Sequence, residues 1–74
     1  MTLFELGEEI KKLRKERGIN QEKLAETAGI SRTTLSRLEN GHFSKISVVA
    51  LSNILSILGY GICIEQKNPF ARNK

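Results

Sequence analysis

Apolar residues recur along most of this chain at the three- and four-residue spacing of amphipathic helices, and one central stretch organises the rest. Within residues 21–28 the apolar residues that share one helical face are Leu24, Ala25 and Ala28. Asn20 directly precedes this segment, where its side chain can cap the first turn of a helix. Gly29 directly follows it, as expected of a residue that ends a helix in the left-handed conformation. The pattern therefore predicts a short helix over residues 21–28.

A second short helix is predicted directly after this turn, from a cap at Ser31 to Asn40. Leu35 and Leu38 are spaced to point toward the core, and the remaining positions are mostly polar or basic. The outward face of this helix consists of Arg32, Thr33, Ser36 and Arg37. Two short helices joined by a tight turn form a helix-turn-helix, and Ala25 is small where the two helices must cross.

One further helix is predicted on each side of this pair. Phe4 to Arg17 is expected to form the first helix, with acids early and bases late, the order that the helix dipole favours. Its apolar stripe consists of Leu3, Leu6, Ile10 and Leu13. The last helix begins at a cap on Ser47 and ends at Leu58. Its apolar residues are too widely spread for one core-facing stripe, which predicts that another chain covers part of it.

The central pair resembles the lambda-repressor/Cro-type helix-turn-helix domain, the XRE family. The positions that match the family pattern are Gln21, Ala25, Gly29, Ile30, Leu35, Leu38 and the LENG sequence at residues 38–41. The resemblance extends from Leu6 to Gly59. It implies an all-α fold, a compact four-helix lambda-repressor-like domain that binds double-stranded DNA through the major groove.

The outward face of the second helix and the resemblance together indicate the residues that contact DNA. Arginine can donate to guanine, and threonine can contact a base edge or a thymine methyl group. The candidates for base reading are Ser31, Arg32, Thr33, Ser36 and Arg37. Contacts to phosphate are implied by the resemblance for Gln21, Asn40, Arg14, His42 and Lys45.

Two of these candidates have a second interpretation. Family members commonly pair the arginine at the position of Arg14 with the glutamate at the position of Glu39. That pair would tie the first helix to the recognition helix and hold an arginine near the DNA backbone, whereas the alternative is an ordinary surface arginine. His42 is expected to be a solvated turn residue facing phosphate rather than a metal ligand, because the chain has no second histidine.

The segment Tyr60 to Glu65 alternates apolar residues with others at a period of two, which predicts a strand. A lone strand leaves its backbone unpaired, so two copies are expected to pair across a homodimer. This arrangement is similar to the HipB-type antitoxins, and the likeness implies a HipA-like kinase toxin as a partner. The residues expected at the dimer interface are Ile57, Tyr60, Ile62, Cys63 and Ile64. Residues 1–66 are thus expected to form one domain, and 67–74 a mobile tail.

Composition narrows the class of protein further. The formal charge of +4 over 74 residues favours a polyanionic partner, although small domains are often basic for no such reason. With one cysteine, neither an intrachain disulfide nor a cysteine-based zinc site can form, so Cys63 is interpreted as a small strand residue rather than a redox group. No catalytic arrangement, metal site or cofactor motif is present, so an enzyme is not expected. The lack of a long apolar run or a signal-peptide pattern predicts a cytoplasmic protein with no membrane partner.

The sequence leaves more than one function open. The favoured interpretation is a homodimeric transcriptional repressor that reads a palindromic operator, as the autoregulating antitoxin of a HipA-like system. A stand-alone XRE-family regulator without a toxin partner is one alternative. A protein-interaction module with little DNA binding is the other. The basic recognition face favours DNA binding over the last of these.

Overall fold

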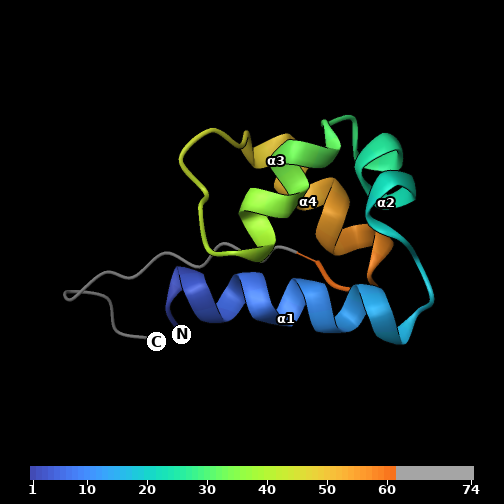
Figure 1. The fold of residues 1–74 in the computed structure, drawn as a ribbon, viewed down its shortest axis with the longest axis horizontal. Coiled ribbons are helices and arrows are strands. Elements are labelled where there is room, and N and C mark those ends of the chain that lie inside the picture. Colours follow the sequence, from blue (N-terminus) through green and yellow to red (C-terminus); the bar gives the residue numbers. More distant parts are fainter. Residues whose placement is uncertain (62–74) are drawn as a thin grey trace, which may run out of the picture.

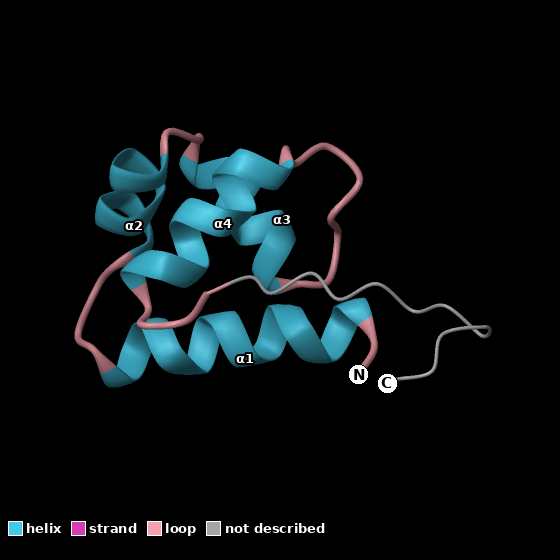
Figure 2. Ribbon diagram, turned by 180° about the vertical axis from the view of Figure 1, so that it is seen from behind, coloured by secondary structure: helices cyan, strands magenta, loops and turns pink. Residues whose placement is uncertain are grey.

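The computed structural model describes residues 1–61, which form four α-helices (Figure 1). These are α1 (Leu3–Glu16), α2 (Gln21–Ala28), α3 (Arg32–Glu39) and α4 (Val48–Ile57). The longest helix, α1, runs along one side of the molecule, and the three shorter helices are grouped over it (Figures 1 and 2). The described part of the chain contains no strand, so the predicted four-helix, all-α arrangement is confirmed for this part.

Each helix begins where a polar side chain accepts a hydrogen bond from the amide three residues later. Asn20 caps α2 at 2.7 Å, and Ser31 and Ser47 cap α3 and α4 at 3.0 Å, as predicted. Thr2 caps α1 through a reciprocal box, in which its own amide also donates to the Glu5 carboxylate at 2.7 Å. Because of this box, α1 begins one residue earlier than the periodicity predicted.

The core is built from the apolar faces of all four helices. Its fully buried large side chains are Ile10, Leu24, Leu35, Leu38, Ile54 and Leu58. The small residues Ala25 and Ala28 are also buried, where α2 packs against its neighbours. Leu3 belongs to the apolar stripe of α1 but lies outside the core, because this side chain is 57% exposed. Leu3 lies one helical turn before the point where α3 crosses α1, so no helix covers it.

The crossing of α1 and α3 depends on a glycine inside α1. A Cβ atom at Gly7 would lie 2.3 Å from the carbonyl oxygen of Leu38 and 2.9 Å from the amide nitrogen of Gly41. Gly41 itself has φ +91°, a conformation that other residues rarely adopt. The end of α3 can therefore lie directly on the backbone of α1 only because position 7 has no side chain. The sequence analysis did not identify this contact.

The apolar surface of α4 is only partly used by the core. Val48 and Val49 remain 72% and 69% exposed, and Tyr60, beyond the helix, is 52% exposed. The helix ends at Ile57, one residue before the prediction, with Leu58 as its cap. The core of the described chain therefore leaves apolar side chains uncovered at the start of α4, as the sequence predicted.

Four of the six residues of the predicted strand, Tyr60 to Glu65, lie outside the described residues. Tyr60 and Gly61 are described and belong to no helix or strand. The dimer-interface candidates Ile62, Cys63 and Ile64, and the predicted tail at 67–74, lie beyond them. Among the helices of residues 1–61, none is long and apolar enough to cross a membrane.

Candidate nucleic-acid interface

The outward side of α3 presents the polar and basic residues expected there. Arg32, Thr33 and Arg37 are exposed, and Ser36 is half-buried between them. We call these four residues the recognition face. Together with Gln21 at the start of α2, they line one shallow hollow. The face therefore includes two arginines and two hydroxyls, groups that can donate to base edges or to phosphate.

Ser31, the remaining candidate for base reading, is the N-cap of α3. Its hydroxyl oxygen accepts from the Thr34 amide at 3.0 Å and lies 2.9 Å from the Thr34 hydroxyl. The side chain is exposed at the N-terminal end of the recognition face. Its cap holds the first turn of α3, which displays Arg32 and Thr33.

A buried ion pair lies beneath this surface. The Arg14 guanidinium donates through Nε to Glu39 Oε2 at 2.6 Å and through Nη2 to Glu39 Oε1 at 3.2 Å. Its Nη1 donates to the Ile19 carbonyl oxygen at 2.9 Å. Arg14 is 7% exposed and Glu39 is 4% exposed, so the pair joins α1 to α3 out of reach of most solvent. The pairing implied by the family resemblance is confirmed, and an ordinary surface arginine is the wrong interpretation.

The buried pair extends to the surface through Gln21. The Gln21 amide nitrogen donates to Glu39 Oε1 at 2.9 Å, and its amide oxygen accepts from Arg32 Nε at 3.4 Å. The first of these bonds has ordinary length, whereas the second is long and exposed. One chain of contacts thus leads from α1 to the recognition face through Arg14, Glu39, Gln21 and Arg32. These contacts help to hold the orientation of α3 relative to α1 and α2.

The residues expected to contact phosphate occupy three different environments. Arg14 is buried, and all three of its side-chain nitrogens donate hydrogen bonds within the protein, so it stabilises the interface from the interior rather than lying at its surface. Gln21 and Asn40 each donate one amide hydrogen within the protein, to Glu39 and to the Ser36 carbonyl oxygen. A side-chain amide has two hydrogens, so each retains one for a ligand.

The loop after α3 contributes the third environment. His42 and Lys45 are exposed there, and with Arg37 they border a small hollow on the loop side of α3. The amide of His42 donates to the Arg37 carbonyl oxygen at 2.9 Å, which closes the loop onto the end of the helix. Arg37 borders both this hollow and the one at the recognition face, so the structure brings the two sets of candidates together around α3.

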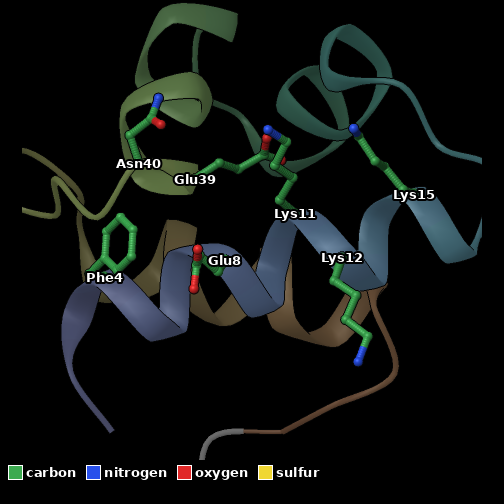
Figure 3. A pocket seen from close by; sticks show the side chains of 7 residues that line it. All are labelled: Phe4, Glu8, Lys11, Lys12, Lys15, Glu39 and Asn40. Carbon is green, nitrogen blue, oxygen red and sulfur yellow. The ribbon is translucent and has the colours of Figure 1, made fainter.

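A further group of charged residues lies between α1 and the end of α3 (Figure 3). The residues that line this hollow are Phe4, Glu8, Lys11, Lys12, Lys15, Glu39 and Asn40. The available signal was the spacing of Lys11 and Lys15, four positions apart on one face of a helix. Which way that face points depends on the packing of α1.

The described residues contain no metal centre, and two of the dimer-interface candidates lie among them. Within residues 1–61, no group of three histidine, cysteine, aspartate or glutamate side chains is placed to hold a metal ion. Of the dimer-interface candidates, Ile57 is half-buried and Tyr60 is exposed.

Comparison with known proteins identifies a matching family and several solved structures with a similar fold. A family model described as helix-turn-helix matches residues 10–63. No curated protein sequence matches the chain. Among solved structures, the clp gene regulator ClgR from Corynebacterium glutamicum is similar with 28% identity and a TM-score of 0.72, over 82% of this chain and 64% of that one.

Two other solved structures with a similar fold are proteins of different kinds. SinR, titled the master regulator for biofilm formation and solved in complex with DNA, has 33% identity and a TM-score of 0.64, over 74% of this chain and 87% of that one. Hydroxypropylphosphonic acid epoxidase from S. wedmorenis has 23% identity and a TM-score of 0.70, over 81% of this chain and 31% of that one. At 23% identity, the similarity to the epoxidase indicates a shared fold and nothing about function. This chain spans less than two thirds of the length of ClgR and about one third of the epoxidase.

Proposed function

Because this chain belongs to the helix-turn-helix family of the lambda-repressor and Cro type, we propose that it is a DNA-binding transcriptional regulator. In this proposal it acts as a homodimeric repressor on a palindromic operator. The helix α3 enters the major groove, and the recognition face reads base edges there.

The observation that best supports DNA binding is the state of the polar groups around α3. Arg32 and Arg37 are exposed, while the nearby Glu39 carboxylate is buried and paired with Arg14. The recognition face therefore presents positive charge to solvent. Glu22 borders the neighbouring hollow beside Arg32, so some negative charge remains at that edge.

Phosphate contacts complete the proposed interface. Gln21 at the start of α2 and Asn40 at the end of α3 each retain a free amide hydrogen, and His42 and Lys45 lie on the loop beyond. Gln21 contacts residues at the two ends of α3, Arg32 and Glu39, and the other three groups follow the C-terminal end of that helix. Contacts to phosphate from both ends would set the register of the helix in the groove without contributing sequence preference.

The proposed homodimer rests on apolar surface and on the sequence beyond α4. Val48, Val49 and Tyr60 are exposed, and the alternating segment from Tyr60 to Glu65 follows. A dimer of this fold that reads one face of B-DNA would place its two recognition helices ~34 Å apart. Its operator would then contain two half-sites with centres roughly 10 base pairs apart, or a further whole turn.

The proposal is tested by measuring binding to the DNA upstream of the protein's own gene. Fluorescence anisotropy with that duplex and with a scrambled duplex of equal length, at two salt concentrations, separates specific from non-specific affinity. We expect the upstream duplex to bind more tightly at both concentrations, and footprinting to show two half-sites. Equal affinity for the two duplexes would contradict autoregulation, and no binding to either would contradict DNA binding altogether.

A narrower proposal is that the regulator is the antitoxin of a HipA-like kinase. It rests on the likeness of the α4-to-strand sequence, Ile54 to Ile64, to HipB-type antitoxins. A kinase gene beside this one, whose product forms a stable complex with this chain, is the expected result. If no such gene is present, a stand-alone regulator is the better description.

An interaction module with little DNA binding is the competing class. The exposed apolar residues of α4 and Tyr60 would serve it as well as they serve a homodimer. The exposed arginines of the recognition face favour DNA binding, because a protein interaction through α4 would not involve them. The same anisotropy measurement distinguishes the two classes.

A further inference from the structure

The hollow between α1 and the end of α3 is bordered by lysine side chains that have no role in the DNA contacts proposed above. Lys11 and Lys15 lie on α1, and Asn40 lies at the end of α3 across from them (Figure 3). The side chains of Lys11 and Lys15 extend to the side of α1 on which α2 and α3 lie (Figure 3). Lys12 also borders the hollow, but its ammonium group extends the opposite way (Figure 3). Two adjacent turns of α1 therefore present ammonium groups on this side, with Lys11 nearer to Asn40 and Lys15 nearer to α2 (Figure 3).

The charges around this hollow leave it positive. Glu39 borders it but is paired with the buried Arg14 guanidinium. Glu8 is the other carboxylate there, nearer to Phe4 (Figure 3). Within residues 1–61 Arg14–Glu39 is the one ion pair, so neither Lys11 nor Lys15 is held by an acid of that part of the chain.

The hollow also continues the line of the recognition face. Arg32, Ser36 and Asn40 follow one another at four-residue spacing, so they lie along one side of α3. Asn40, the last of the three, is also the point where the hollow begins. A helix in the major groove is flanked by the phosphates of the DNA strands, since the groove is only about 12 Å wide. Cations next to the end of α3 are thus placed to meet a strand that borders the groove.

We infer that Lys11 and Lys15 form, with Asn40, a phosphodiester-binding strip through which α1 holds the DNA backbone beside the groove that α3 occupies. This inference rests on the proposed function and extends it to a third element. Lysine suits the task because it is a flexible point charge that tolerates variation in phosphate position. The contacts are independent of sequence, so they raise affinity for every duplex alike.

The test compares three single substitutions that each remove one charge from the same helix. Lys11→Gln, Lys15→Gln and the control Lys12→Gln are made in the full chain, and helical circular dichroism checks that each folds. The probe is a random-sequence duplex of about three helical turns, and the dissociation constant is measured over a range of salt concentrations. For Lys11→Gln and Lys15→Gln, the slope of log affinity against log salt should be shallower by about 0.9 each. The Lys12→Gln slope should match that of the unaltered chain.

The possible outcomes separate this inference from the proposed function. Equal slopes for the three variants would overturn the phosphate strip, because the direction of the side chain would then have no effect. A loss confined to one sequence-matched duplex, with random DNA unaffected, would overturn it too, since phosphates hold no sequence information. If the unaltered chain binds no DNA at any salt concentration, the proposed function itself is wrong.

Discussion

At the scale of single residues, the surface of this domain depends on polar groups that are bonded to one another before any ligand arrives. Glu39 is the centre of this arrangement, since its two carboxylate oxygens accept from Arg14 and Gln21. An unpaired carboxylate at this depth would be costly, whereas the paired one links three helices. The exposed arginines of α3 are thereby freed from a competing acid.

Removing the Glu39 carboxylate should destabilise the protein strongly. Glu39→Ala leaves the Arg14 guanidinium buried without its partner, a change that typically costs about 3–5 kcal/mol. Urea titration followed by circular dichroism measures the loss in the free energy of unfolding. The control is Glu26→Ala on the exposed side of α2, which should change that free energy by less than ~0.5 kcal/mol. Similar values for the two variants would show that the ion pair adds nothing to stability.

Arg32 should contribute sequence preference, and Gln21 should not. We expect Arg32→Ala to weaken specific binding by ~1–3 kcal/mol and to relax the preference at one base pair. Gln21→Ala should weaken binding to all duplexes alike, because the proposed contact is to phosphate. Competition titrations with operator and scrambled duplexes measure both effects. The assignment of Arg32 fails if its loss weakens binding to scrambled DNA while operator binding is unchanged.

At the scale of elements, the orientation of the recognition helix is set by its crossing with α1. The missing side chain at Gly7 allows the backbone at Leu38 and Gly41 to approach α1. The Arg14–Glu39 pair closes the same interface farther along α1. Backbone contact at one point and a buried ion pair at another together limit how α3 can tilt. The recognition face is therefore presented by a fixed helix rather than by a loop.

Substitution of Gly7 tests this crossing. Alanine is favoured over glycine in a helix by about 1 kcal/mol, which would stabilise α1 taken alone. The new methyl group would lie 2.3 Å from a backbone oxygen, however, and forced packing of this kind costs typically 1–3 kcal/mol or more. We expect Gly7→Ala to lower the free energy of unfolding and to weaken DNA binding as α3 shifts. Thermal unfolding and anisotropy measure the two effects.

The control for this substitution is Gly61→Ala. Gly61 has an ordinary backbone conformation and open space around the position of a Cβ atom. Its replacement should leave the free energy of unfolding unchanged. A Gly7→Ala protein as stable as the unaltered chain would show that the crossing can adapt without loss.

At the scale of the whole molecule, the four helices form a complete core while leaving apolar side chains on the surface. The buried residues of α1, α2, α3 and α4 pack into one cluster. Val48, Val49 and Tyr60 lie outside it. A domain whose core is already complete can fold without the segment that follows α4. Folding and association should therefore be separable by experiment.

Truncation after Gly59 tests whether they are. It removes Tyr60 and the predicted strand, and it should leave helical circular dichroism near native, because every core residue identified within residues 1–61 lies before the cut. Sedimentation should then show a monomer whose operator binding is much weaker, since two linked half-sites are no longer bound together. A truncated chain that remains dimeric at micromolar concentration would assign the interface to α4 and leave the strand without a role in it.

The sequence by itself determined the helices, their caps and the motif, because these depend on residues close together in the chain. Asn20, Ser31 and Ser47 could be recognised as caps from their position alone, and Gly29 as the end of α2. Apolar spacing predicted most of the core for the same reason. Periodicity identifies a face and not whether another helix covers it, so Leu3 continues the apolar stripe of α1 and is still exposed.

The tertiary structure decided everything that depends on which surfaces meet. The contact of Arg14 with Glu39 spans 25 positions, so spacing could not predict it and only the family resemblance implied it. The need for glycine at position 7 arises from a backbone more than thirty positions away, at Leu38 and Gly41. Likewise, Lys11 and Lys12 are neighbours of the same type in the sequence. Both border the hollow, but the packing of α3 against α1 separates their side chains, since that of Lys11 extends toward the side where the recognition helix lies and that of Lys12 extends away from it.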